Sequence, residues 1–126
     1  MKTILIVDDE PADVLELILD AQGYRVLTAA NGQQGLELLE QSRVDLVISD
    51  VMMPVMDGAE MVGILRRRPG GARLPVLIVT ALAESAVRHL LTDYDAFMRK
   101  PMSIAELLIN CERLLAPDSR VASLLH

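Results

Sequence analysis

The sequence predicts an α/β fold, with a doubly wound parallel sheet of five strands between two layers of helices. Short apolar, β-branched runs alternate with longer segments of helical periodicity along the chain. Some of these runs are almost continuously apolar, which is typical of parallel strands buried on both faces. With 126 residues, of which 52% are hydrophobic, the chain suits one domain with a full core.

The five strands are predicted from the apolar runs. Residues 2–7 form a run that stops at Asp8, and residues 44–49 form a run that stops at Asp50. Both are expected to be buried on both faces of the sheet. The other three strands are expected at residues 24–28, 75–79 and 95–98.

The first helix is predicted to start near Pro11, a residue that suits a first helical turn, and to stop at Gly23. Its apolar residues recur at helical spacing: Val14, Leu17, Ile18 and Ala21. The later helices are expected at residues 33–41, 58–68, 84–92 and 104–116. In the fourth helix the apolar residues are Val87, Leu90 and Leu91, and in the last Cys111 lies on the apolar stripe.

Residues 1–117 are expected to form the single domain, and residues 118–126 a C-terminal tail or the start of a linker. The sequence leaves open whether the domain stands alone or is part of a longer protein. It shows neither a bilayer-spanning run of ~20 apolar residues nor a signal peptide, so a cytoplasmic protein is expected.

Composition excludes several classes of function. With 12 basic and 18 acidic side chains, the formal net charge is −6, which argues against direct nucleic-acid or membrane binding by this domain. The single cysteine excludes an internal disulfide and a multi-cysteine metal site. Only two tyrosines and one phenylalanine are present, which excludes an aromatic platform for bases or sugars.

Chemistry is expected at the carboxyl ends of the strands, where doubly wound sheets place their sites. The residues at those ends are Asp8, Asp9, Asp50, Thr80 and Lys100. Three carboxylates packed together repel each other, and a divalent cation relieves that repulsion. Mg²⁺ favours a few carboxylates, water and a phosphate oxygen. A carboxylate beside Mg²⁺, with a lysine and a threonine to receive oxygens, can accept a phosphoryl group.

These residues resemble the receiver domain of bacterial two-component response regulators. The matching segments are Asp8-Asp9, Asp50, the loop Met53-Pro54-Val55-Met56-Asp57-Gly58, Thr80-Ala81 and Lys100-Pro101. The resemblance covers residues 2 to about 116. It implies the strand order 2-1-3-4-5 of flavodoxin-like folds.

The resemblance also implies a role for each acidic residue and the lysine. Asp50 would be the phosphoacceptor, taking its phosphoryl group from the histidine of a sensor kinase or phosphotransfer protein. Asp9, Asp50 and the backbone carbonyl of Met52 would bind Mg²⁺ directly, with Asp8 acting mostly through water. Lys100 would pair with the phosphoryl oxygens.

The remaining roles concern the switch and the loop beside the site. Thr80, followed by Ala81, would turn its hydroxyl toward the modified Asp50. Phe97 would be the switch aromatic, able to act only by packing because it has no hydroxyl. Pro54, Asp57 and Gly58 would shape the loop. The switch would change the surface of the fourth helix, the fifth strand and the fifth helix.

Each residue also has a purely structural alternative. Asp50 and Lys100 could be solvated surface groups, and Asp8 and Asp9 could favour a helix N-terminus. Thr80 could be an ordinary helix cap and Phe97 an ordinary core residue. The run Arg66-Arg67-Arg68 is interpreted as a charged helix C-terminus. His89 and His126 are expected to be exposed, and neither is assigned as a ligand or phosphodonor.

Two segments depart from the family pattern. The first helix and the segment from Thr80 to Lys100 are each shorter by about two residues, and Asp93-Tyr94 stands where many members have Gly-Ala. The usual dimer surface is therefore in question, and a monomer or weak homodimer is expected. Met52 and Leu82 are apolar at positions that influence hydrolysis, which predicts a long-lived phosphoryl group.

The expected protein is a signalling module and not a turnover enzyme. One rival is a non-phosphorylated interaction module with the same fold, and the intact set of site residues argues against it. Another is a phosphatase with an aspartyl-phosphate intermediate. Its usual Asp-x-Asp motif after the first strand is missing, because Asp8 and Asp9 are adjacent.

Overall fold

A five-stranded parallel sheet forms the centre of the molecule in the computed structural model, which describes residues 1–10 and 13–116. The strand order is β2-β1-β3-β4-β5, and every neighbouring pair is parallel. The predicted fold class and strand order are confirmed. The strands are β1 (Thr3–Val7), β2 (Arg25–Ala29), β3 (Leu46–Ser49), β4 (Val76–Thr80) and β5 (Ala96–Arg99).

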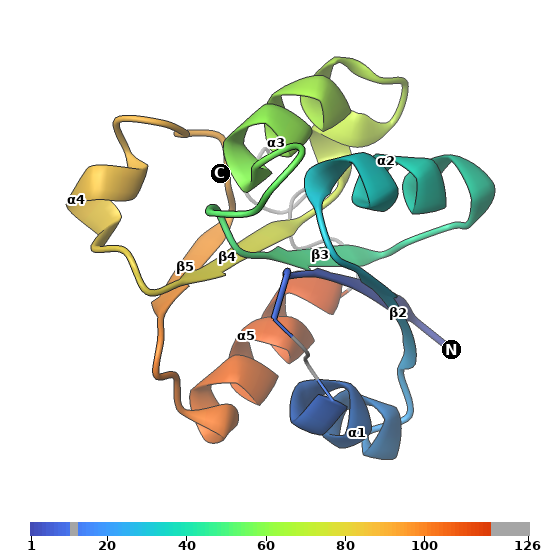
Figure 1. Cartoon of the computed structure of the whole chain (residues 1–126). Helices are drawn as coiled ribbons and strands as arrows, with labels where there is room; N and C mark the ends of the chain where they lie inside the picture. The colour runs from blue at the N-terminus through green and yellow to red at the C-terminus, as the bar shows by residue number, and fades with distance from the viewer. Residues whose placement is uncertain (11–12, 117–126) are drawn as a thin grey trace, which may run out of the picture.

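Helices cover both faces of this sheet (Figure 1). Helices α2 (Gly32–Gln41) and α3 (Gly58–Arg67) lie on one face, and α1 (Asp13–Ala21) and α5 (Ile104–Leu115) on the other. The short helix α4 (Glu84–Val87) stands beside the edge strand β5, and the 3₁₀ turn η1 (Gly71–Arg73) leads into β4. The two faces have separate apolar clusters. Alternate residues of each interior strand therefore serve different helix layers.

The interior strands are the most buried part of the chain. All residues of β1, β3 and β4 are buried, as their continuous apolar sequences predict. In β5 only Met98 is buried. Cys111 lies in the core under α5, as predicted, and burial raises the pKa of its thiol to about 11.

The first helix packs through a different stripe from the one predicted. Val14 and Leu17 are each 69% exposed, whereas Leu19 is fully buried and Leu15 packs against the same cluster. Two overlapping sets of apolar residues have helical spacing in this segment, and periodicity alone does not decide which set faces the sheet. Pro11, the predicted first-turn residue, lies outside the described residues.

The fourth helix is shorter than predicted. A helix was expected over residues 84–92, but α4 ends at Val87, and Leu90 is 56% exposed. Its N-terminus receives no side-chain cap, and tighter turns follow, in which the amides of His89 and Leu90 bond to carbonyls three residues back. A single uncapped turn gains little helical stability by itself.

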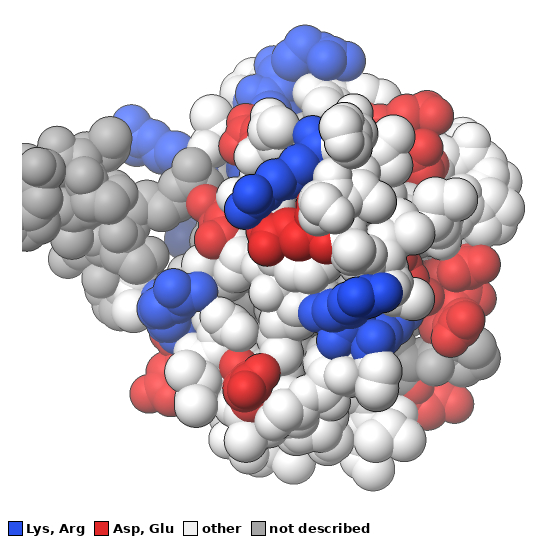
Figure 2. Space-filling model, turned by 90° about the vertical axis from the view of Figure 1, so that its left-hand side faces the viewer, with Lys and Arg blue, Asp and Glu red and all other residues white. Residues whose placement is uncertain are grey.

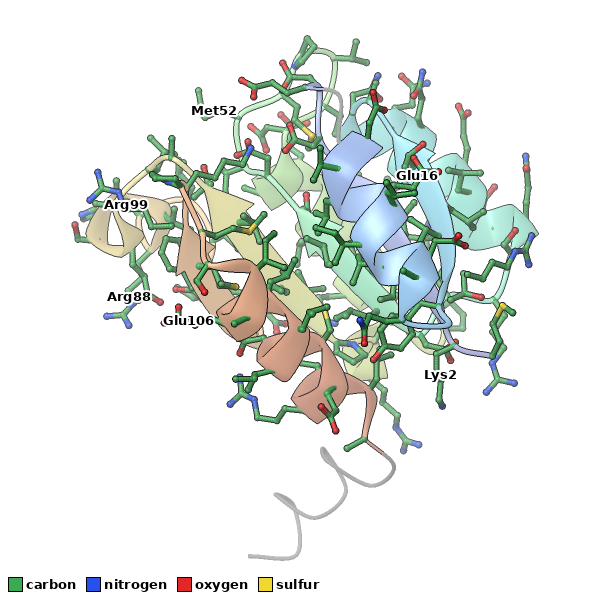
Figure 3. All side chains as sticks on the ribbon, turned by 90° about the horizontal axis from the view of Figure 1, so that it is seen from below. Lys2, Glu16, Met52, Arg88, Arg99 and Glu106 are labelled. Carbon is green, nitrogen blue, oxygen red and sulfur yellow. The ribbon has the colours of Figure 1, made fainter. Side chains whose placement is uncertain are left out.

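The other elements differ from prediction by one or two residues at their ends, which is the usual uncertainty of boundaries. No helix among residues 1–10 and 13–116 is long and apolar enough to cross a bilayer. The predicted tail, residues 118–126, and His126 lie outside the described part of the chain. Met52 lies near one end of the sheet and Lys2 near the opposite end (Figure 3).

Candidate functional site

Two carboxylates meet at the carboxyl end of the sheet because their strands are neighbours. Asp8 directly follows β1, and Asp50 directly follows β3. Backbone hydrogen bonds continue one residue past each strand, from Asp8 N to Ala29 O at 3.0 Å and from Asp50 N to Val7 O at 2.9 Å. Both side chains therefore start from backbone that the sheet holds in place.

Lys100 joins these two carboxylates. Its Nζ donates to Asp8 Oδ2 at 2.7 Å and to Asp50 Oδ2 at 2.9 Å. The three residues come from three separate loops and are brought together as the sequence predicted. Charge-assisted bonds of this length are among the stronger ones in proteins.

The Asp50 carboxylate is strongly supported in its ionised form. Burial by itself would raise its pKa, but the Lys100 ammonium, the Thr80 hydroxyl and the amide of Val51 together hold the pKa of Asp50 below its ordinary value. The Val51 amide donates to Asp50 Oδ1 at 2.7 Å. Burial would likewise lower the pKa of Lys100, but Asp8 and Asp50 raise it above the usual range. Asp50 is thus a charged group with its oxygens directed by donors.

Thr80 and Ala81 lie at the end of β4, beside the acidic pair. Thr80 is buried, and its hydroxyl oxygen accepts a long bond from the Leu82 amide at 3.4 Å. The Ala81 carbonyl accepts from Arg99 Nε at 3.1 Å, which links the β4–α4 loop to β5. The Thr80 hydroxyl also bonds to the Asp50 carboxylate, so it lies close to that group.

Phe97, the predicted switch aromatic, is half-buried on β5 and packs against the cluster under α3. Its ring centroid lies 6.3 Å from that of Tyr94, and the Tyr94 hydroxyl donates to Glu84 Oε2 at 2.7 Å. Aromatic packing therefore connects β5 to α4 on this side of the sheet.

The loop from Asp50 to Gly58 is tightly folded. The Gly58 amide donates to Val51 O at 2.8 Å, and a β-carbon at Gly58 would overlap the carbonyl oxygen of Asp50. Asp57 caps α3 by accepting from the Glu60 amide at 2.8 Å. Both residues make contacts within the loop that was predicted to include them.

Pro54 and Val55 form the tip of the same loop. The Met56 amide donates to the Pro54 carbonyl at 2.7 Å, and Val55 has a φ of 69°, in the left-handed region. A valine with positive φ is strained, so the surrounding loop must hold this conformation. The Met56 carbonyl accepts from the Gly32 amide at 2.9 Å, which ties the loop to the start of α2.

Sequence analysis missed one polar residue of the site. Ser49 is fully buried at the end of β3, and its hydroxyl donates to the Asp50 carbonyl at 2.7 Å. A hydroxyl directly before the acidic residue, at the end of an otherwise apolar strand, was the available signal. The bond satisfies a buried polar group and supports the backbone that carries Asp50.

The carboxylates at this site suit a Mg²⁺ ion that takes only some of its ligands from the protein and the rest from water. Asp8 and Asp50 already share one cation, the Lys100 ammonium, and Asp9 is an exposed neighbouring carboxylate. No group of three acidic, histidine or cysteine side chains converges as a metal site among residues 1–10 and 13–116. Mg²⁺ commonly keeps several waters and uses one or two carboxylates with phosphate oxygens, so these residues fit it.

Acidic residues also line a hollow of about 360 Å³ beside the site. Its acidic residues are Asp8, Asp9, Glu10, Asp13 and Glu16. On the face that carries α4, positive and negative groups are interspersed without a large patch of one sign (Figure 2). His89 is exposed, as predicted.

Comparison with known proteins establishes the family. The model of the response regulator receiver domain matches residues 4–112. The chain belongs to the response regulator receiver family. The receiver is 34% identical to the DNA-binding dual master transcriptional regulator RpaA of Synechocystis sp., over 96% of this chain and 52% of that protein. It therefore spans about half the length of this relative.

Solved structures of receiver domains have the same fold. The receiver domain of a signal transduction histidine kinase from Syntrophus aciditrophicus is 37% identical, with a TM-score of 0.84 over 91% of this chain and 90% of that one. The receiver domain of a sensor histidine kinase from Pseudomonas aeruginosa is 31% identical, with a TM-score of 0.84 over 90% of this chain and 97% of that one. The latter has a magnesium ion coordinated in its active-site cleft.

Proposed function

We propose that this receiver accepts a phosphoryl group on Asp50 from a phosphohistidine of a sensor histidine kinase or histidine phosphotransfer protein. The observation that carries the proposal is the position of Lys100, whose ammonium bonds to both Asp8 and Asp50. A cation in this place can pair with phosphoryl oxygens as negative charge arrives. The magnesium-bound relative supports Mg²⁺ as the cofactor.

The transfer requires only positioning and charge neutralisation. A carboxylate oxygen of Asp50 attacks phosphorus, an O–P bond forms, and the N–P bond of the phosphohistidine breaks. The electron pair of that bond goes to the imidazole nitrogen. Asp9, Asp50 and the Met52 carbonyl would hold Mg²⁺, with Asp8 acting through water, and the ion would supply positive charge beside the phosphoryl oxygens.

The phosphoryl group would then change the contacts of Lys100 and Thr80. Lys100 would exchange its bond to Asp50 Oδ2 for a phosphoryl oxygen, and the buried Thr80 hydroxyl would bond to another. Phe97 packs on the same strand as Lys100 and would follow these movements. We propose that this shifts the population of states of the α4–β5–α5 surface, which a downstream protein or fused output domain recognises.

Exposed apolar side chains support docking of a phosphodonor protein at this end of the sheet. Met52 and Val55 are exposed on the β3–α3 loop, and Val14 and Leu17 on the first two turns of α1. Helix α1 also contributes Asp13 and Glu16 to the acidic hollow that Asp8 and Asp9 line. An apolar patch rimmed by charge is typical of a protein-interaction surface.

We also propose a cytoplasmic location, where nucleotide-dependent kinases would supply the phosphoryl group.

The proposed module transfers one group and does not turn over a substrate. Intact mass before and after incubation with acetyl phosphate and Mg²⁺ tests this. The parent should gain one phosphoryl group, and chelation of the metal or the change Asp50→Ala should abolish the gain. Asp20→Ala, at an exposed acidic residue of α1, is the matched control and should retain it. Absence of any gain in the parent would favour the non-phosphorylated interaction module.

The phosphoryl group is proposed to be long-lived, because Met52 and Leu82 offer no group that could orient an attacking water. Met52 is exposed beside Asp50, and Leu82 is half-buried after Thr80. Met52→Asn should shorten the lifetime of the phosphorylated form, followed by intact mass after removal of the phosphodonor. Loss of the parent's label within seconds, with no acceleration in the variant, would contradict this.

A further inference from the structure

Arg66 is almost completely buried at the end of α3, with 9% of its side chain exposed. The sequence had suggested only a charged helix C-terminus for Arg66-Arg67-Arg68. Instead, Nη1 of Arg66 donates to the carbonyls of Gly71 at 2.8 Å and Leu74 at 2.6 Å. One guanidinium therefore holds the chain that leads from α3 into β4.

The same guanidinium also holds the segment that leads into β5. Nη2 of Arg66 lies 3.2 Å from Asp95 Oδ2 and 3.4 Å from the carbonyl of Asp93, and Nε lies 3.2 Å from Asp93 Oδ1. We call Arg66, Asp93 and Asp95 the Arg66 clamp. It joins α3 to a part of the chain 27 to 29 residues later.

Asp95 in turn starts the pairing of β5 with β4. Its amide donates to the Val76 carbonyl at 2.9 Å, and its carboxylate accepts from the Val76 amide at 2.7 Å. The pairing ends five residues later, where the Lys100 amide donates to the Thr80 carbonyl at 2.8 Å. Asp95 and Lys100 are thus the two ends of one short ladder, roughly 16 Å apart along an extended strand.

Besides its pairing with β4, the packing of Phe97 and the Arg99 bond to Ala81, strand β5 has few contacts that fix its register. It is an edge strand of four residues, only Met98 of which is buried, and the one-turn helix α4 precedes it. A slip of one residue would turn each side chain to the opposite face of the sheet. Lys100 would then no longer extend from a point where it reaches Asp8 and Asp50.

We infer that Arg66 is a positioning residue for phosphorylation: through Asp95 it fixes the register of β5 and so places the Lys100 ammonium on Asp50. This rests on the proposed function, since it assigns the reach of Lys100 to the proposed phosphotransfer. Arg66 acts at the end of β5 away from the site and touches no reacting atom. A guanidinium is required because its planar fork lies against three carbonyls and two carboxylates at once, which a lysine ammonium cannot do.

The test compares initial phosphorylation rates with acetyl phosphate and saturating Mg²⁺ in the full chain, with the folded fraction checked by circular dichroism. Arg66→Lys should slow phosphorylation about tenfold, less than the ~10²-fold that a 1 Å misplacement can produce. Asp95→Asn should slow it by a smaller factor. Arg67→Lys changes an exposed arginine on the same helix and should match the parent. Equal rates in the Arg66 variant and the parent would overturn the inference.

A double-mutant cycle with Lys100→Gln separates positioning from general destabilisation. If Arg66 acts through Lys100, Arg66→Lys should produce less than a roughly twofold further loss in the Lys100→Gln background. A full tenfold loss in that background would overturn the inference. The phosphorylation rate of the parent distinguishes the proposed function from the role of Arg66. Failure of the parent to accept a phosphoryl group counts against the proposed function, whereas unchanged rates in the Arg66 variant count only against the role of Arg66.

Hydrogen exchange of the Lys100 amide gives a result that does not depend on phosphorylation. This amide bonds to Thr80 at the opposite end of β5 from Arg66. Arg66→Lys should speed its exchange about tenfold under native conditions, while Arg67→Lys should not. Unchanged exchange at Lys100 in a folded Arg66→Lys protein would overturn the inference.

Discussion

The interior strands and the edge strand both supply site residues, but different forces hold them. Asp8 and Asp50 follow β1 and β3, in which every residue is buried and each strand has a neighbour on both sides. Lys100 follows β5, which has one neighbour and one buried residue. The carboxylates are thus placed by core packing, and their cation by polar contacts at the two ends of a short strand.

This difference shows how one site can combine a rigid part and a movable part. The acidic residues keep their geometry because moving them would disturb both apolar clusters. The ammonium follows a strand with one buried residue, so we expect it to change partner at a lower energetic cost. Under the proposed function, that division would suit a switch whose output surface includes β5.

The largest expected effect on stability comes from shortening a buried side chain in an interior strand. Leu5→Ala on β1 removes a fully buried side chain and should lower the free energy of unfolding by about 4 kcal/mol. Met98→Ala removes the buried residue of β5 and should lower it by about 2 kcal/mol, at the low end of the usual range. Urea denaturation measures both. An equal or larger loss of stability in Met98→Ala would contradict the view that core packing holds the interior strands more strongly than the edge strand.

The site loop should be nearly as sensitive. In Gly58→Ala the new methyl group would overlap the Asp50 carbonyl, so the free energy of unfolding should fall by about 2 kcal/mol and phosphorylation should slow. Gly63→Ala is the matched control within α3, where the nearest atom is 3.8 Å away. It should raise stability by about 0.5–1 kcal/mol, because alanine favours a helix over glycine. Destabilisation of similar size in both variants would contradict the assigned role of Gly58.

The pH dependence of the free energy of unfolding at acidic pH should depend on the contact between Asp50, which follows an interior strand, and Lys100, which follows the edge strand. The pKa of Asp50 is lowered in the folded state, so the unfolded chain binds the proton more readily. The resulting stabilisation should be present above the pKa of the unfolded chain and lost as the pH falls through the lower pKa of the folded state. Asp50→Asn should therefore have a flatter stability profile below pH ~4 in urea denaturation. Parallel profiles for parent and variant would refute the coupling.

The smallest effect is expected at the edge. Tyr94→Phe removes the hydroxyl that donates to Glu84 Oε2 and should lower the free energy of unfolding by about 0.5 kcal/mol, because the pair is partly exposed. Tyr24→Phe is the control. No hydrogen bond from the Tyr24 hydroxyl is present among residues 1–10 and 13–116, so that change should be smaller still. A loss above ~2 kcal/mol at Tyr94 would mean that α4 is more firmly attached than its one turn indicates.

The sheet and the acidic site were predictable because strong local signals coincide there. Continuous apolar runs identified β1 and β3, and the residues after them were expected to meet at one edge of the sheet. The contacts of Lys100 with Asp8 and Asp50 agree with that expectation. Local propensity and the tertiary fold give the same answer in this part of the chain.

The edge and α1 were less predictable because several patterns compete there. Leu90 extends a helical stripe with Val87 and Leu91, yet the helix ends before it. In α1, Leu15 and Leu19 face the core instead of Val14 and Leu17. These choices depend on contacts distant in sequence, which periodicity does not encode.

Arg66 was missed because a run of three arginines resembles a solvated helix end. Its position was nevertheless informative, since Arg66 lies four residues after the buried Val62 and so on the same side of α3. A charged residue on a buried stripe needs a partner, and the partners are 27 to 29 residues further on. Nothing local in the sequence identified them.

The separation of 50 residues between Asp50 and Lys100 also has a consequence during synthesis. At about 5–20 residues per second, a ribosome adds the lysine some 3–10 s after the aspartate. Strands β1, β2 and β3 are complete by then, so a nascent chain that has paired them already holds Asp8 and Asp50 together. During that interval the two carboxylates lack the ammonium that joins them in the folded chain, and a bound cation would relieve their mutual repulsion. The Lys100 ammonium, which follows the last strand, therefore joins a pair of carboxylates that the earlier strands have already brought together.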